Sequence, residues 1–114
     1  MQPVLLHNPN CSKSRSAIEW LESKGLKFAV REYLQDPLSE SELLDLAEKL
    51  DAPLCEWVRD AQALSEFEGL PQDEQNEALA QFVHEHPEAM QRPILICGDR
   101  ARVGRPTEAF EEIL

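Results

Sequence analysis

The spacing of apolar residues changes twice within the first 34 positions of the chain. The run Pro3–His7 is typical of a short buried strand, and apolar residues then recur at helical spacing from Ser12 to Lys24, where Gly25 supplies a stop. A second strand is predicted over residues 28–34. Strand, helix and strand together have the length of a βαβ unit, which implies that the two strands pair in parallel.

The middle of the chain carries mainly helical patterns. Ser39 stands three residues before Glu42, which is the spacing of a capping box at a helix start. Helices are predicted over about 39–50, 53–58 and 73–84, with a turn at 69–71. This stretch therefore indicates a helical segment between two strand-containing ends.

Strand patterns return near the C-terminus. Pro93–Cys97 is a continuous apolar run, and Gly98-Asp99 has glycine first, as a type II′ hairpin turn requires. Arg100–Val103 is predicted to return as the partner strand, and a last helix is predicted to begin at Pro106 or Thr107. The C-terminal end thus has the order ββα.

The order βαβ, helices, ββα predicts an α/β fold with a mixed sheet and a helical insertion at about 38–90. It resembles the thioredoxin-like arrangement. The length of 114 residues is that of one domain, so residues 1–114 are expected to form a single domain. The N-terminal apolar run is too short for a signal or a membrane span, and the chain is expected to be soluble and cytoplasmic.

The net charge of −11 argues against nucleic acid or an anionic membrane as a partner. The charge is uneven: residues 1–31 carry five basic and two acidic side chains, 32–91 carry two and sixteen, and 92–114 carry four of each. If the two ends fold together, they can hold an anion. The acidic middle is equally well explained as a set of solvated helix faces, and the two explanations are compatible.

One of the three cysteines stands in a distinctive stretch, HNPNCSKSR, between the first strand and the first helix. No CxxC occurs, so a disulfide framework is not expected. A helix N-terminus, with Lys13 and Arg15 nearby, favours a Cys11 thiolate and equally a bound oxyanion. His7 has two possible roles: a hydrogen bond to the loop, or a positive charge that lowers the thiol pKa. The alternative is an inert cysteine among ordinary turn and N-cap residues.

Three arginines stand at positions suited to binding an anion. Arg59 is one of only two basic residues in the acidic middle, and Arg92 and Arg105 each precede a proline at the start of an element. Planar guanidinium groups bind tetrahedral oxyanions bidentately. The alternative for each arginine is a surface salt bridge.

The segments HNPNCSKSR, WVRD, RPILIC and GRPTEAF, in this order and over nearly the whole chain, closely resemble the glutaredoxin-linked arsenate reductases of the ArsC family. The resemblance implies the thioredoxin-like fold with a helical insertion. It implies that Cys11 is the nucleophile and that Arg59, Arg92 and Arg105 bind the oxyanion. It further implies that His7 and Ser14 tune the thiol and that the bond before Pro93 is cis.

The reaction implied by the resemblance is reduction of arsenate to arsenite, with glutathione as co-substrate, glutaredoxin as partner and no bound cofactor. Ser14 stands where a CxxC motif would have its second cysteine, so an external reductant is expected. Neither Cys55 nor Cys97 is expected to resolve the intermediate. A monomer is expected, with no metal site.

Other functions are weighed against this one. A glutathione-dependent thiol or disulfide reductase of the same fold needs no arginine set, and an Spx-like regulatory module typically uses CxxC. A metal module of His7, Cys11 and His84 or His86 lacks a recognised ligand spacing. A tyrosine-phosphatase loop needs arginine six residues after the cysteine, where this chain has Ala17.

Overall fold

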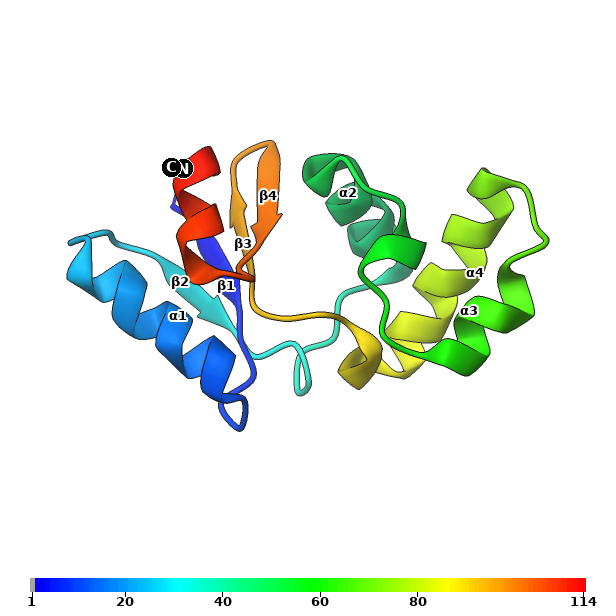
Figure 1. Ribbon diagram of the computed structural model, residues 1–114, viewed down its shortest axis with the longest axis horizontal. Helices are drawn as coiled ribbons and strands as arrows, with labels where there is room; N and C mark the ends of the chain where they lie inside the picture. Colours follow the sequence, from blue (N-terminus) through cyan, green and yellow to red (C-terminus); the bar gives the residue numbers. More distant parts are fainter. Residues whose placement is uncertain (1) are drawn as a thin grey trace. The chain divides into compact units, whose positions relative to one another are not determined.

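The computed structural model describes residues 2–114, which divide into two compact units (Figure 1). The sheet unit comprises the chain up to Asp36 together with Arg92–Leu114, and the helical unit comprises Pro37–Gln91. The predictions of a single domain and of an insertion at about 38–90 are not tested by this division and stay predictions.

The sheet unit is built on a mixed four-stranded sheet with the order β2-β1-β3-β4. Its strands are β1 (Val4–Leu6), β2 (Ala29–Arg31), β3 (Ile94–Cys97) and β4 (Arg100–Val103). β1 pairs with β2 in parallel and with β3 antiparallel, and β3 and β4 form the C-terminal hairpin. The predicted parallel βαβ unit and the predicted hairpin at Gly98-Asp99 are confirmed, and the fold is the α/β, thioredoxin-like one.

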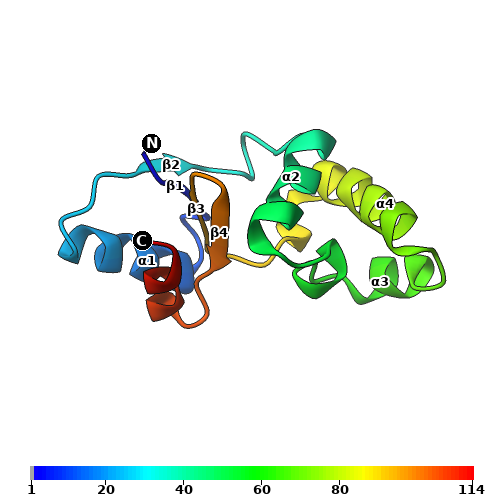
Figure 2. The ribbon, with the colours of Figure 1, turned by 90° about the horizontal axis from the view of Figure 1, so that it is seen from above.

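Two helices pack on this sheet, α1 (Ser12–Ser23) and the 3₁₀ helix η3 (Thr107–Ile113), and they contact each other (Figure 2). Their inward side chains meet the central strands in one apolar cluster. The cluster consists of Leu5, Ala17, Leu21, Leu95, Phe110 and Ile113. Gly25, with a φ of 70°, ends α1 as predicted, because glycine adopts this left-handed conformation without steric cost.

The second strand is shorter than predicted. Its ladder ends at Arg31, and Tyr33 lies in a turn in which the N–H groups of Gln35 and Asp36 donate to the carbonyl of Glu32 at 3.0 and 2.9 Å. β2 is an edge strand, so β1 alone pairs with it, and its ladder ends where β1 ends at Leu6. The apolar character of residues 33–34 therefore reflects burial in a turn and not strand pairing.

The helical unit contains α2 (Glu40–Leu50), η1 (Leu54–Glu56), α3 (Ala61–Phe67), α4 (Gln72–Glu85) and η2 (Pro87–Ala89). The capping box is confirmed: Ser39 N–H donates to Glu42 Oε1 at 2.9 Å, and Glu42 N–H donates to Ser39 Oγ at 3.1 Å. The predictions did not include α3. Its start signal is Asp60, whose Oδ1 accepts from Ala63 N–H at 2.9 Å.

The core of the helical unit forms where α4 packs on α2, α3 and η1. Trp57 is buried there, and its Nε1–H donates to the Ala52 carbonyl at 3.2 Å. A bridge between Val58 and Met90 joins the segment after η1 to the end of the unit. Between residues 2 and 114, no helix is both long and apolar enough to cross a membrane.

Candidate active site

Cys11 stands at the junction of β1 and α1 and is the N-cap residue of the helix. Its backbone is extended, with φ −104° and ψ 122°. Its N–H donates to the Asn8 carbonyl at 3.0 Å, and its own carbonyl accepts from Arg15 N–H at 3.0 Å. These bonds fix the cysteine where the unpaired N–H groups of the first helical turn converge.

The pKa of the Cys11 thiol is lowered from its ordinary value. Partial burial raises the pKa, but the hydrogen bond from the Ser14 backbone N–H, the Arg92 side chain and the Lys13 backbone N–H together outweigh burial. Lys13 acts through its backbone, and the Arg15 guanidinium donates to the Pro9 carbonyl at 3.0 Å. The formal charge that lowers the pKa is therefore that of Arg92, where the sequence suggested Lys13 and Arg15.

His7 and Ser14 form a buried pair beside the cysteine. His7 Nδ1 lies 2.6 Å from Ser14 Oγ, and Ser14 Oγ also accepts from the Asn8 N–H at 3.0 Å. Burial lowers the pKa of His7 and Arg15 adds to this effect, while Glu32 opposes it. The sequence left two roles open for His7, a hydrogen bond to the loop or a positive charge. The structure shows a hydrogen-bonding contact with Ser14 in the first turn of α1, and burial favours the neutral imidazole.

Arg92 and Arg105 lie together in the sheet unit. Arg105 Nε–H donates to the Arg92 carbonyl at 2.7 Å, and Gly104 N–H donates to the Pro93 carbonyl at 2.8 Å. The peptide bond before Pro93 is cis, as the resemblance implied, and so is the bond before Pro106. Arg92 Nε is buried and has no hydrogen-bond partner. The structure thus places Arg92 beside the Cys11 thiol and Arg105 beside Arg92.

Arg59 belongs to the helical unit. It is exposed, and its backbone N–H donates to the Ala89 carbonyl at 2.6 Å. Its expected part in oxyanion binding stays a prediction.

Tyr33 is a candidate that the sequence reasoning missed. It is fully buried in the sheet unit, its hydroxyl has no hydrogen-bond partner, and it interacts electrostatically with Cys11, Arg92 and Arg105. A usable signal was present in the sequence. Tyr33 is the only tyrosine of the chain, and it follows the strand that was predicted to run parallel to the strand before Cys11.

The two other cysteines are free and half-buried. Cys97 pairs with Arg100 at the turn end of β3, and antiparallel pairing of Val4 with Ile96 places it beside the start of β1. Cys11 follows the other end of β1, so Cys97 lies at the opposite edge of the sheet. Among residues 2–114, no group of three or more His, Cys, Asp or Glu side chains is arranged to hold a metal ion.

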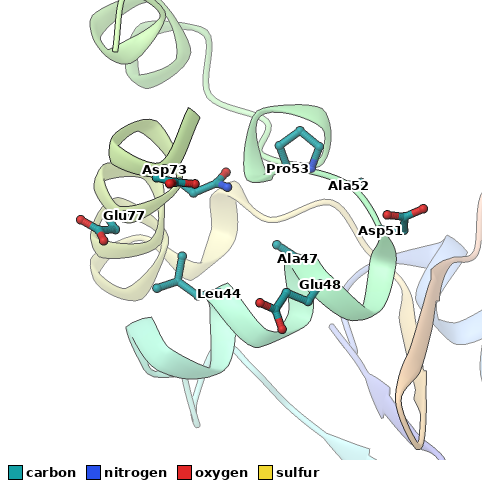
Figure 3. Close-up of a pocket in the computed structure, with 9 residues that line it drawn as sticks. Leu44, Ala47, Glu48, Asp51, Ala52, Pro53, Asp73 and Glu77 are labelled. Carbon is teal, nitrogen blue, oxygen red and sulfur yellow. The ribbon is translucent and has the colours of Figure 1, made fainter. Parts of the chain in front are cut away.

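Two cavities differ in the charge of their walls. A cavity of about 480 Å³ in the helical unit is lined by Glu48, Asp51, Asp73 and Glu77, whose carboxylates repel an oxyanion (Figure 3). A cavity of about 410 Å³ in the sheet unit is lined by Lys13 and Arg105 together with Gly104, Pro106, Thr107 and Glu108. Of these two cavities, only the second is lined by a residue close to Cys11 in the sequence, namely Lys13.

Comparison with known proteins gives a consistent result. An arsenate reductase of Haemophilus influenzae is 37% identical over 116 residues, covering 100% of both chains, and one of Neisseria meningitidis is 38% identical over 96% of both. A solved structure described as an arsenate reductase from Vibrio cholerae has a TM-score of 0.85 and 36% identity, and the match covers 100% of this chain and 98% of that one.

The pattern that defines the ArsC family matches residues 6–113, a range that runs from the end of β1 nearly to the C-terminus. It includes Cys11 and all three arginines discussed above. With full-length relatives above 30% identity, this match identifies the protein as a member of the ArsC family.

Proposed function

We propose that this protein reduces arsenate to arsenite with Cys11 as the nucleophile. The observation that carries the proposal is a thiol at the N-terminus of α1 whose pKa is lowered by two backbone N–H groups and by Arg92. A thiolate is the reactive form of cysteine, and the same surroundings favour a tetrahedral oxyanion. The names of the relatives from Haemophilus influenzae and Neisseria meningitidis support arsenate as that oxyanion.

The first step forms a bond between Cys11 Sγ and arsenic. One arsenic–oxygen bond breaks, and the oxygen takes up two protons and leaves as water. Arsenic remains pentavalent in this adduct. Glutathione then displaces a second oxygen as water, which leaves arsenic bonded to both the Cys11 sulfur and the glutathione sulfur. The difficult reduction is thereby divided into thiol substitutions.

The redox step belongs to glutaredoxin. Its thiolate attacks the glutathione sulfur, so a glutaredoxin–glutathione mixed disulfide forms and the electron pair of the sulfur–arsenic bond stays on arsenic. Arsenic becomes trivalent, and water then replaces Cys11 so that arsenite leaves. The distance of Cys97 from Cys11 across the sheet supports an external reductant, since Cys97 does not offer a second thiol at this edge.

The arginines have a defined electrostatic task in this scheme. Arsenate is mostly a dianion near neutral pH and repels a thiolate. Arg92 and Arg105 offset that repulsion and stabilise charge on the transferring oxygens, and the resemblance to the ArsC family predicts the same task for Arg59. Their guanidinium groups carry the substrate specificity that distinguishes an arsenate reductase from a plain thiol reductase.

The direct test measures arsenite formation by separating arsenic species after incubation with arsenate, glutathione, glutaredoxin, glutathione reductase and NADPH. Each component is omitted in turn. Arsenite that forms only when both glutathione and glutaredoxin are present supports the full proposal. If arsenite forms equally well with a thioredoxin system alone, the proposed reductant is refuted but the arsenate reductase activity is supported. The absence of arsenite with active glutaredoxin refutes the reaction itself.

A second candidate is a glutathione-dependent thiol or disulfide reductase. The lowered pKa of Cys11 favours it, because a reactive thiol in a CxxS motif also forms mixed disulfides with glutathione. The same mixture with a glutathionylated peptide in place of arsenate tests it. NADPH oxidation with the peptide but not with arsenate would favour this candidate.

A further inference from the structure

Tyr33 lies at the same edge of the sheet as Cys11. β1 and β2 run in parallel, so the segments that follow them emerge at the same edge. The His7 N–H donates to the Arg31 carbonyl at 2.9 Å, which extends this pairing by one residue on the β1 side. Cys11 follows His7 by four residues and Tyr33 follows Arg31 by two. The topology thus brings a phenol and a thiol from separate segments to one place.

The Tyr33 hydroxyl is a buried polar group without a partner. The residue has 0% exposure, and the accessible surface of the hydroxyl oxygen is below 1 Å². Arg92 Nε is the other buried side-chain nitrogen or oxygen atom between residues 2 and 114 that has no hydrogen-bond partner. Buried polar groups in folded proteins are nearly always paired, so each unpaired one calls for an explanation.

The surroundings of Tyr33 keep the phenol protonated. Burial raises the pKa of Tyr33, the Arg92 charge lowers it, and the nearby Cys11 charge raises it. The Asn8 side-chain amide, as a donor near the phenol oxygen, and the Arg105 charge lower it less, and neither accepts the phenol hydrogen. A protonated phenol can donate a hydrogen bond. The thiol does not use this donor, because the groups that lower the pKa of Cys11 are the Ser14 and Lys13 N–H groups and Arg92.

Two unpaired buried donors, the Tyr33 hydroxyl and Arg92 Nε, therefore belong to residues that interact with Cys11. Each of these two groups carries a hydrogen that it can donate, and neither hydrogen has an acceptor in the described residues. A tetrahedral oxyanion has several acceptor oxygens and satisfies more than one donor at once. An apolar or cationic ligand would leave both donors unpaired.

We propose that Tyr33 is a substrate-binding residue whose hydroxyl donates a hydrogen bond to an oxygen of the tetrahedral oxyanion held at Cys11 and Arg92. This inference rests on the proposed function, since it names a further contact to the same substrate. A neutral donor adds directional binding without adding charge, which the guanidinium groups already supply.

The test uses Tyr33→Phe, which removes the hydroxyl and keeps the ring. Binding is measured without turnover, as the protection of Cys11 against alkylation by iodoacetamide at increasing concentrations of arsenate or of inorganic phosphate. We expect Tyr33→Phe to raise the Kd for both oxyanions about tenfold and to lower kcat/KM for arsenate about 10- to 100-fold, as for the loss of one hydrogen bond to a charged group. The pH profile of alkylation without anion should not change.

Ser23→Ala is the matched control. It also removes one hydroxyl from the sheet unit, but Ser23 lies in the last turn of α1 and donates to the Trp20 carbonyl at 2.6 Å. Its Kd values should equal those of the unmodified chain. Tyr33→Phe with an unchanged Kd overturns the inference. A shifted pH profile of alkylation with an unchanged Kd also overturns it, because the hydroxyl would then act on the thiol.

A measurement on the unsubstituted chain tests the same hydrogen bond even if the Tyr33→Phe variant does not fold. Tyr33 is the only tyrosine, so a chain labelled with ¹³C at tyrosine Cζ gives a single ring resonance. Saturation with inorganic phosphate should shift this resonance, and an unmoved resonance at saturation would contradict the hydrogen bond. If oxyanions protect Cys11 but no arsenite forms, the proposed function fails while Tyr33 is still judged by its Kd. If neither oxyanion protects Cys11, both proposals fail.

Discussion

His7 Nδ1 and Ser14 Oγ lie 2.6 Å apart, and this buried contact joins the end of β1 to the first turn of α1 across the loop that carries Cys11. Ser14 also supplies a backbone N–H that lowers the pKa of the Cys11 thiol. A bond made by the Ser14 side chain thus fixes the part of the helix whose backbone acts on the cysteine. The geometry of the thiol depends on residues that do not touch it with their side chains.

Ser14→Ala should destabilise the protein. The substitution removes the acceptor of the Asn8 N–H and the partner of His7, and it leaves partly buried polar groups unpaired. We expect a loss of about 1–3 kcal/mol in the free energy of unfolding, measured by urea denaturation. Ser16→Ala, at an exposed position of the same helix, should change the free energy by no more than about 0.5 kcal/mol. Equal effects of the two substitutions would contradict the described role of Ser14.

Stability should fall in mildly acidic solution because His7 must become charged. Burial lowers the pKa of His7 below its ordinary value of 6.5, so the unfolded chain takes up a proton before the folded chain does. The contribution of His7 is therefore fully present above pH 6.5 and is lost as the pH falls through and below that value. One proton accounts for a slope of at most about 1.4 kcal/mol per pH unit.

The measurement for His7 is urea denaturation at several pH values between about 7.5 and 5.5, which lies above the ordinary range of carboxylate titration. The His7→Gln variant should show a smaller slope than the unmodified chain in this window. His84→Gln is the comparison variant, because it also removes one imidazole but from an exposed position of α4, where His84 Nδ1 lies 2.8 Å from the Leu38 carbonyl oxygen. A slope that His7→Gln leaves unchanged would show that His7 does not carry this pH dependence.

Arg92→Ala should raise the pKa of Cys11. Arg92 contributes both a hydrogen bond and a positive charge to the thiolate, and its loss removes two of the effects that lower the pKa. The pH dependence of iodoacetamide alkylation measures this change, and the midpoint should move to higher pH. Arg102→Ala removes an exposed arginine of β4 that pairs with Glu112, and it should leave the midpoint in place. An unmoved midpoint in Arg92→Ala would exclude Arg92 as a neighbour of the thiolate.

Gly104→Ala should disturb the support of both site arginines in the sheet unit. A Cβ atom at Gly104 would lie 2.5 Å from Phe110 Cζ, whose ring is fully buried and cannot move away freely. We expect a loss of about 1–3 kcal/mol in the free energy of unfolding, as for other overpacked cores. Gly69→Ala meets no atom within 4 Å and serves as the control. A neutral Gly104→Ala would mean that the Phe110 ring adjusts without cost.

Much of the fold could be predicted because local patterns determine it. The alternation of strand and helix spacing identified β1, α1 and the β3–β4 hairpin, and the Ser39 and Glu42 pair located the start of α2. The predicted strand extended wrongly over residues 33–34, because a turn that is buried also requires apolar residues. The start of α3 was missed because an Asp60 cap before seven residues gives a weak periodic signal.

The site could be predicted only in part, for a different physical reason. Cys11 and its helix N-terminus are neighbours in sequence, so HNPNCSKSR indicated them directly. Which charge acts on the thiol is decided by the fold, and it is Arg92, 81 positions away, that the sheet brings there. Tyr33 reaches the same edge through the parallel pairing of β1 and β2, and its unpaired hydroxyl is visible only in three dimensions.

The role of Cys11 as the nucleophile is tested most directly by Cys11→Ser. Arsenite formation is compared between Cys11→Ser, Cys97→Ser and the unmodified chain in the complete glutathione and glutaredoxin mixture, with thermal unfolding to establish that each variant folds. We expect Cys11→Ser to form no arsenite above the protein-free rate while Cys97→Ser keeps the rate of the unmodified chain. A folded Cys11→Ser variant that forms arsenite at the unmodified rate would contradict the account.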